Sequence, residues 1–509
     1  MAIRLKSCGV LFPTALVSVA LLTRIADAQI STGGLNQQIN PFGDAGSTNS
    51  NQVQANTYGV DAGVGETDNV NLTPTDRVSQ TIAIADTDFT VDQRSRLFDV
   101  NAVGNFSYLD YLQNAYGNEL LGRFDGIADA AIVPGRVVWV LRDDFGQSAL
   151  DPYTPVTPNN IEYINYVTTG PDLKLPFGGV NFLDVSARYA RAQYQTSPLN
   201  SNRLLGSIAL GRDVSAGGSI SLNANTERVM FSNTVLNTDF ERSSVFGRYE
   251  VQGARTYFVG ELGATVVSQP RESAAVVPEI VTLGTSAAFF EPRPLPVVTT
   301  PSGSPGSLSG PLAKLELSRK ISASAKVIFR AGRDLTDASS SFSTQATRIT
   351  GINPITSAAL TSDSYRVTYA SAGWEYKRNR TTLAVTGRWE QDIYPGLPSL
   401  DVTLPGADLR VERRMTRAFT AQLVGSWNKT DYPHAALVSQ VIGSTEYANN
   451  ILGAALIWRH GRGLEIRLRC DHDTYTASNG NTGYHVTQAF LTVGYRPQPN
   501  PPTEDVSER

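Results

Sequence analysis

Cysteine is almost absent from this chain, and its scarcity limits how the fold can be stabilised. The 509 residues include 2 cysteines, Cys8 and Cys470. Cys8 lies in an N-terminal segment that we expect to be removed on export, so the mature chain cannot form an intrachain disulfide. Exported proteins commonly use disulfides. This chain must instead depend on a fold that needs no covalent links.

Long hydrophobic runs and an excess of one charge are also missing. Beyond the N-terminus no apolar run reaches the ~20 residues that a membrane-spanning helix requires. Charged residues make up 18% of the chain, and the net charge is −4. A balance this close to neutral argues against a nucleic-acid partner.

Alternation of apolar and polar residues is the dominant pattern that is present. It is clearest in residues 464–471 (LEIRLRCD), where four apolar residues alternate with four charged ones. Successive side chains of a strand point to opposite faces, so one face would be aliphatic and the other charged. Similar alternation occurs in residues 245–251, 383–390 and 418–428. Repeated strands with one apolar and one polar face are typical of a transmembrane β-barrel.

The N-terminus has the features of an export signal. Arg4 and Lys6 precede an apolar stretch, residues 9–22, and Ala26 and Ala28 form a small-x-small cleavage site. We therefore expect residues 1–28 to be a signal peptide that directs the chain through the general secretory pathway. A membrane anchor is the alternative, but the apolar stretch is too short for one.

The remaining chain divides into one large unit with two polar ends. Residues 29–56 are rich in Gln, Asn, Gly and Ser and predict a disordered periplasmic linker. Residues 57–497 predict a single all-β domain, an up-and-down antiparallel barrel of about 18–20 strands, and residues 498–509 a disordered tail. Short, often basic connections alternate with long polar ones, as in outer-membrane barrels, where the short turns are periplasmic. A soluble β-sandwich, the alternative, would not need that asymmetry.

Three segments carry a resemblance to a known family. They are residues 65–77 (GETDNVNLTPTDR), 119–146 (ELLGRFDGIADAAIVPGRVVWVLRDDFG) and 489–497 (AFLTVGYRP). Here the chain resembles a family of Gram-negative outer-membrane β-barrels associated with exopolysaccharide biosynthesis and export. The resemblance extends from about Tyr58 to Pro497. It implies an outer-membrane barrel of this size, with a polysaccharide substrate and a periplasmic polysaccharide-export protein as partners, and supplies no catalytic residue.

If the apolar faces contact outer-membrane lipid, the opposite faces bring charged side chains into the lumen. These lumen-lining candidates are Arg123, Asp125, Arg188, Arg248, Glu250, Lys314, Glu316, Lys326, Arg330, Arg388, Glu390, Arg410, Glu412, Glu465, Arg467 and Arg469. They could pair across strands and brace the wall. Arginines among them could also bind sugar hydroxyls and carboxylates along a hydrated path. Arg467 and Arg469, two residues apart on one strand, predict a local preference for anions.

Enzyme chemistry has little support in the sequence. No Ser-His-Asp set has a recognisable local context, and no Gly-rich phosphate loop is present. Asp471, His472 and Asp473 could bind a metal, but neighbours in a strand point apart. We therefore expect no enzyme activity, no metal and no cofactor.

A channel for polysaccharide passage across the outer membrane is the function we expect. A structural or assembly barrel that does not conduct is the alternative, and the two differ in whether the lumen is open. The longest loop, residues 268–310, could fold into the lumen as a constriction. Its Pro and Ser content also fits an external loop that packs against nothing.

Overall fold

The computed structural model describes residues 56–153, 156–269, 307–348, 359–434, 445–461, 463–478 and 483–497, without the side chains of 345–348. The expected signal peptide, the linker up to residue 55, the C-terminal tail and residues 270–306 of the longest loop lie outside these ranges.

Among the described residues, twenty strands form one closed sheet. Their bounds are β1 Thr57–Thr67, β2 Gln80–Arg94, β3 Phe98–Tyr111, β4 Glu119–Val133, β5 Val137–Ala149, β6 Ile161–Phe177, β7 Asn181–Tyr194, β8 Ser201–Ser215, β9 Gly218–Phe231, β10 Phe240–Gln252, β11 Thr256–Ser268, β12 Ser307–Ser322, β13 Ala325–Thr336, β14 Tyr365–Arg378, β15 Thr381–Ile393, β16 Val402–Arg414, β17 Phe419–Asp431, β18 Glu446–His460, β19 Leu464–Ala477 and β20 Tyr484–Tyr495. In the described parts of the connections lie two short 3-10 turns, η1 Pro158–Asn160 and η2 Pro398–Leu400, and one helix, α2 Ala338–Arg348.

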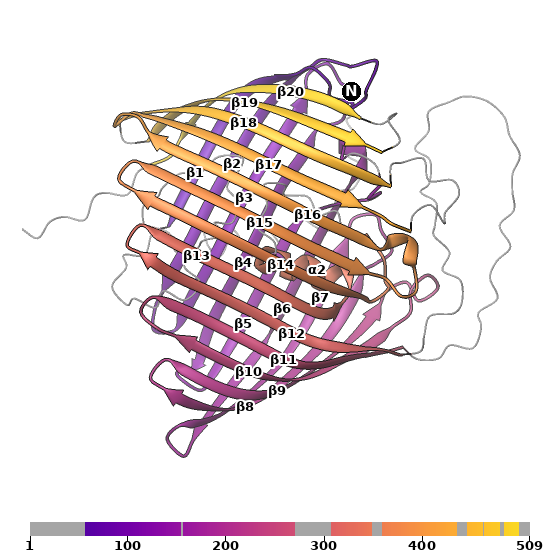
Figure 1. Ribbon diagram of the computed structural model, residues 1–509, viewed down its shortest axis with the longest axis vertical. Helices are drawn as coiled ribbons and strands as arrows, with labels where there is room; N and C mark the ends of the chain where they lie inside the picture. Colours follow the sequence, from indigo (N-terminus) through magenta and orange to yellow (C-terminus); the bar gives the residue numbers. More distant parts are fainter. Residues whose placement is uncertain are drawn as a thin grey trace, which may run out of the picture.

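Each strand pairs antiparallel with its neighbour in sequence, and the first strand closes on the last. β1 pairs with β20 from Val60 opposite Tyr495 to Thr67 opposite Gln488. The tilted strands at the front and back of the barrel cross in Figure 1. The fold is therefore the expected all-β, up-and-down antiparallel barrel, with the upper strand number of the expected range.

The connections at the two ends of the barrel differ in length. Nine connections, from residues 95–97 to residues 461–463, are two to four residues long and lie at one end, which we call the turn end. The ten connections at the other end, which we call the loop end, run from the 6 residues of 195–200 to the 38 residues of 269–306. Both described ends of the barrel chain, Asn56 and Pro497, lie at the turn end.

The two faces of the wall have opposite polarity, as β19 shows. Leu464 and Leu468 are 40% and 51% exposed, whereas Glu465 and Arg467 are 1% and 9% exposed. Large apolar side chains stay exposed in strands around the wall, and examples are Val64, Leu204, Leu262, Trp374, Trp427 and Leu491. Exposed apolar surface on this scale requires lipid or another apolar cover. The wall is therefore apolar outside and polar inside, as a transmembrane barrel needs. Among the described residues, no helix is long and apolar enough to cross a membrane.

Two strands begin earlier than their prolines suggest. β12 starts at Ser307, before Pro311, and β16 starts at Val402, before Pro405. Proline has no N–H to donate to a ladder. Pro405 is tolerated because the β16–β17 ladder has no pair between Thr403 and Gly406. Pro311 lies beyond the end of the β12–β13 ladder, which starts at Ala313.

A buried ionic cluster lies where the barrel closes. Arg496, which follows β20 and is 1% exposed, bonds the Asp61 carboxylate on β1 and lies 2.6 Å from Asp88 Oδ1 on β2. Its Nε is 3.7 Å from Glu465 Oε1 on β19, and Glu465 also pairs with Arg467 at 2.6 Å. One guanidinium therefore links four neighbouring strands at the turn end.

Replacing Arg496 with Gln should weaken the closed barrel. Buried carboxylates would lose a charged partner, which typically costs about 3–5 kcal/mol. We expect a lower guanidinium chloride midpoint, measured by tryptophan fluorescence of the protein in detergent. Arg417→Gln, in the exposed turn between β16 and β17, is the control and should leave the midpoint unchanged. Equal midpoints for both variants would contradict this role.

Cys470 tests which face meets lipid. It is exposed and shares a face with Leu464 and Leu468. A charged thiol reagent should label it slowly in the bilayer-inserted barrel and rapidly after unfolding. A cysteine introduced at Lys314, whose side chain is 40% exposed on the opposite face, should react faster in a Cys470→Ser background. Faster labelling of Cys470 would mean that the faces are reversed.

Candidate functional site

A helix lies inside the barrel. α2 follows β13 directly, and its first turns are buried, with Ala338 and Phe342 each 6% exposed. Figure 1 shows α2 between the front and back of the wall. We call the side of the wall that faces α2 the inner face. This helix belongs to the connection between β13 and β14, whereas residues 270–306 of the loop that could have formed a constriction lie outside the described residues.

The sequence of α2 does not favour a helix, and we did not expect one there. Its eleven residues, ASSSFSTQATR, are mostly Ser and Thr, which have modest helix propensity and compete for backbone hydrogen bonds. One local signal exists: Asp337, immediately before the helix, accepts a hydrogen bond from the backbone N–H of Ser339 at 3.2 Å. Contacts with the wall must supply the remaining stability.

The first of these contacts is an ionic cluster at the start of α2. The Arg203 guanidinium on β8 is 0% exposed, and its Nη2 lies 2.6 Å from Asp337 Oδ2. Its Nη1 lies 3.0 Å from Glu227 Oε1 and donates to Ser340 Oγ at 2.9 Å. Arg242 on β10 pairs with Glu227 and lies 3.6 Å from Asp337 Oδ1. We call these five residues the helix anchor.

Two further polar contacts hold α2 to other strands. Tyr194 Oη on β7 lies 2.8 Å from Ser339 Oγ. Arg142 on β5 donates from Nη2 to the Ser343 carbonyl at 2.7 Å and pairs with Asp144 at 2.9 Å. With the helix anchor, these contacts join α2 to strands from β5 to β10.

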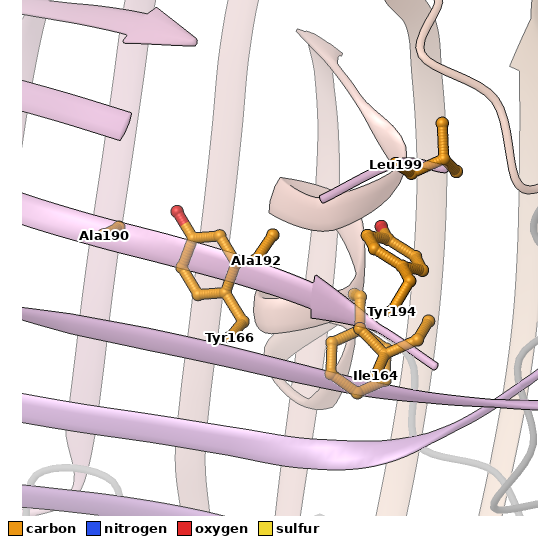
Figure 2. Close-up of a cluster of buried hydrophobic side chains, with 7 residues drawn as sticks. Ile164, Tyr166, Ala190, Ala192, Tyr194 and Leu199 are labelled. Atoms are coloured by element: carbon orange, nitrogen blue, oxygen red, sulfur yellow. The ribbon is translucent and has the colours of Figure 1, made fainter. Parts of the chain in front are cut away.

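An apolar cluster completes this interface. Ile164 and Tyr166 on β6 pack beside Ala190, Ala192 and Tyr194 on β7, together with Leu199 and Phe342. Figure 2 shows these side chains from the two strands, with Tyr194 and Ile164 at the end toward Leu199. The alanines are 0% exposed, and their small side chains let the helix approach the wall. Gly146 does the same on β5, since an added Cβ would lie 3.2 Å from Phe342.

The charge state of Asp337 follows from its surroundings. Burial by itself would raise the pKa of this carboxyl, but the charges and hydrogen bonds of Arg203, together with Arg242, lower it well below its ordinary value of 3.8. Asp337 therefore stays ionised at neutral and mildly acidic pH. A lowered folded-state pKa stabilises the folded form above the ordinary value, and this stabilisation is lost as pH falls through the lowered value.

The register places the predicted lumen residues on the inner face. Cross-strand partners share a face, so the pairing can be followed around the barrel from Tyr194 and Arg203. Four of the resulting pairs join two predicted residues: Arg248 with Glu250, Arg330 with Glu316, Arg410 with Glu412, and Arg467 with Glu465. Four others pair with carboxylates that are not among the sixteen lumen-lining candidates: Arg188 with Asp172, Lys314 with Asp334, Arg388 with Asp408, and Arg469 with Asp471.

The remaining predicted residues have neighbours on the same face. Asp125 lies opposite Asp144, and Arg123 lies within the field of both carboxylates. Lys326 lies opposite Glu375, and Glu390 opposite Tyr369. A role for any of these sixteen residues in moving a solute stays a prediction.

The anion preference expected at Arg467 and Arg469 does not follow from this structure. Arg467 lies 2.6 Å from Glu465, and Arg469 lies 2.5 Å from Asp471, so carboxylates offset both charges. The inner face also carries carboxylates that the sequence analysis did not name, and they include Asp61, Asp86, Asp88, Asp144, Glu227, Glu261 and Asp408. Strands β1 and β2 contain several Gly and Ala residues between them. Their sequences therefore show no clear apolar face from which the aspartates could be assigned to the interior.

Many inner-face ion pairs keep contact with solvent. The side chains of Arg248 and Glu250 are 37% and 32% exposed, and Lys314 is 40% exposed. Arg410 and Glu412 are 32% and 35% exposed. An exposed charge on the inside of a closed wall needs water beside it. The interior along these strands is therefore hydrated.

Tyrosines stack near the loop end of the inner face. The rings of Tyr365 and Tyr394 are 4.5 Å apart, and Tyr475 lies 4.9 Å from both Tyr447 and Tyr484. Tyr365, Tyr394, Tyr475 and Tyr484 are at most 5% exposed. These rings pack against protein, so they brace the rim and are not a surface for a ligand.

The residues weighed as a metal site do not converge. Asp471 and Asp473 lie on the inner face, and His472 lies exposed on the outer face, its ring 6.1 Å from that of His485. In the part of the chain that the structure describes, no three His, Cys, Asp or Glu side chains are placed to hold a metal ion.

Fold and site together define a transmembrane β-barrel with a hydrated, charged inner wall and an internal helix. No family model matches the chain, and no curated protein sequence matches it.

Some solved structures align with the chain at low sequence identity. One is the siderophore receptor PirA from Pseudomonas aeruginosa, 9% identical over 87% of this chain and 81% of that one, with a TM-score of 0.37. The copper transporter OprC is 10% identical over 87% and 82%, with a TM-score of 0.39. The FrpB iron transporter from Neisseria meningitidis is 9% identical over 86% and 82%, with a TM-score of 0.40. At these scores the likeness carries no argument about what this chain binds or transports.

Replacing Asp337 with Asn should release α2 from the wall. Arg203 and Arg242 would lose a buried charged partner, which typically costs about 3–5 kcal/mol. Hydrogen exchange at the amides of residues 339–344 should accelerate at least about a hundredfold. Thr344→Ala, which changes an exposed residue of the same helix, should leave exchange at the other amides near the wild-type rate.

Protection of the same amides should hardly change in the wild type between pH 7 and pH 5, after correction for intrinsic exchange. The pKa of Asp337 is lowered, so its stabilising effect should be lost only as the pH falls below 3.8. Loss of protection near pH 5 would contradict this assignment.

Proposed function

We propose that this barrel is a non-enzymatic outer-membrane channel through which a hydrated polymer, a polysaccharide, passes. The observation that carries the proposal is the inner wall, whose charged pairs stay partly exposed although the wall is closed on all sides. A barrel of this strand number is wide enough to enclose water. A dry, filled interior would instead bury these side chains.

The proposed location in the outer membrane rests on the apolar outer face of the barrel and on the lengths of its connections. Closed barrels with an apolar outside occur in the outer membrane, with short turns in the periplasm and longer loops outside. The turn end, where both described ends of the barrel chain lie, would then face the periplasm. Lipid of the outer membrane would cover the exposed apolar side chains. A periplasmic polysaccharide-export protein could deliver the polymer at the turn end.

The chemistry of the wall favours a neutral or weakly charged polymer. Arginines such as Arg330 and Arg410 each lie beside a carboxylate, at 3.1 Å from Glu316 and 3.5 Å from Glu412. Paired groups offer donors and acceptors to hydroxyls without a strong net field. The polysaccharide itself is an expectation from the family resemblance, and the inner wall is compatible with it.

A non-conducting structural barrel is the second candidate. The observation that favours it is the firm attachment of α2, whose helix anchor includes the fully buried Arg203. A helix held in this way could close the lumen permanently. The two functions differ in the conductance of the purified protein.

Planar-bilayer recordings should show discrete conductance steps for the wild type. Arg330→Glu changes the inner-face charge by two units and should shift the reversal potential in a salt gradient toward cation selectivity. The matched control, Glu316→Arg with Arg330→Glu, exchanges the partners, keeps the net charge and should stay near the wild-type selectivity. If inserted wild-type protein and the Asp337→Asn variant both fail to conduct, the structural barrel is the better description. Equal selectivity of all three proteins would contradict a path along this wall.

A further inference from the structure

The outer face of the barrel has a groove in addition to its apolar belt. The groove has a volume of about 590 Å³ and crosses strands from β9 to β14. Small residues form its floor: Gly247, Gly260, Ala313 and Ala331. Leu262 lies opposite both Gly247 and Ala313, and it is 75% exposed. Bulky side chains therefore lie beside glycines and alanines. The hollow between them has a mainly apolar surface, which suits a hydrocarbon chain.

Two arginines lie at the loop side of this groove. Arg333 on β13 lines the groove and lies opposite Ala313. Arg366 on β14 is offset from it by two residues, because Arg333 lies opposite Thr368 and Leu335 opposite Arg366. Both have the parity of outer-face residues. Two guanidinium groups therefore share one patch outside the barrel.

Neither arginine has an anionic partner among the described residues. The Nε atom of Arg333 and that of Arg366 are buried and have no acceptor in the described chain. No ion pair joins either side chain to a described residue, and their outer-face neighbours Thr368 and Gln391 carry no charge. A buried guanidinium donor without an acceptor is costly, so an acceptor from outside the described residues, such as an anion, would complete the site.

The height of the pair corresponds to the lipid headgroups. Arg366 is the second residue of β14, at the loop end, and Arg333 lies three residues before the end of β13. Trp389 on β15, 38% exposed, lies on the same outer face, opposite Ala370, which is four residues along β14 from Arg366. Tryptophan and arginine are typical of the boundary between hydrocarbon and headgroups.

We propose that the groove and the two arginines bind one phosphorylated lipid of the leaflet at the loop end. One acyl chain occupies the groove, and the headgroup phosphate lies between Arg333 and Arg366. Guanidinium groups bind phosphate through paired, charge-assisted hydrogen bonds, and two of them match a phosphate monoester with nearly two negative charges. A lipid of the lipid A type, with phosphate monoesters on a sugar headgroup, has this chemistry.

Native mass spectrometry of the detergent-purified barrel tests the proposal. The protein is incubated with lipid A, with phosphatidylglycerol or with phosphatidylcholine, and retained lipid is counted per chain. The wild type should retain one lipid A, and Arg333→Gln with Arg366→Gln should weaken retention by at least about tenfold. Ala331→Leu, which fills the floor of the groove without changing charge, should also weaken it.

The matched control removes two other outer-face arginines near the loop end, Arg191 and Arg228, which are exposed to solvent. Arg191→Gln with Arg228→Gln should leave retention of lipid A unchanged. Retention that survives loss of Arg333 and Arg366, or equal retention of phosphatidylcholine and lipid A, would overturn the site. The result does not depend on whether the barrel conducts.

Discussion

The hydrogen-bonded closure of β1 on β20 is the constraint on which the rest of this structure depends. In hydrocarbon, each backbone N–H or C=O without a partner costs several kcal/mol, so a sheet with open edges cannot span the membrane. The closing ladder runs from Val60 to Thr67 on β1. Arg496 adds charged contacts to β1, β2 and β19 at one end of that ladder. Gly494 leaves space for them, since an added Cβ would clash with Asp61.

Because the barrel wall is a single closed sheet, each strand contacts lipid on one face and the interior on the other. A side chain meets lipid or the interior according to its parity alone, and a shift of one residue would exchange the faces. The register therefore determines the electrostatics of the lumen. Opposite charges lie beside each other along a strand, as in Arg248 with Glu250, and across strands, as in Arg330 with Glu316. The same pairs brace the wall and lower its net field, and this is why single arginines do not predict selectivity.

Much of the barrel could be predicted from the sequence, because lipid enforces a period of two in the strand pattern. Strand number, connection asymmetry and the face of residues such as Glu465 follow from it. The rule weakens where other contacts replace lipid. Ile82 and Ile84 face inward, where they pack against Val70 and Phe490. Helix α2 could not be predicted from the sequence, since its stability comes from contacts with Arg203 on a strand 134 residues away in the sequence. The residues of α2 do not identify so distant a partner.

The arginines show most clearly how the barrel interior and the membrane differ as environments for a charged side chain. Inside, the protein itself must supply the anions, and Arg203 is surrounded by Asp337, Glu227 and the Ser340 hydroxyl. Outside, a protein carboxylate near the headgroups would face repulsion from the negative surface of the membrane. Arg333 and Arg366 have no such carboxylate among their described neighbours, whereas phosphate is abundant at that depth. A guanidinium without a partner among the described residues can be completed at this height by a phosphate of the membrane, which is the partner that we propose.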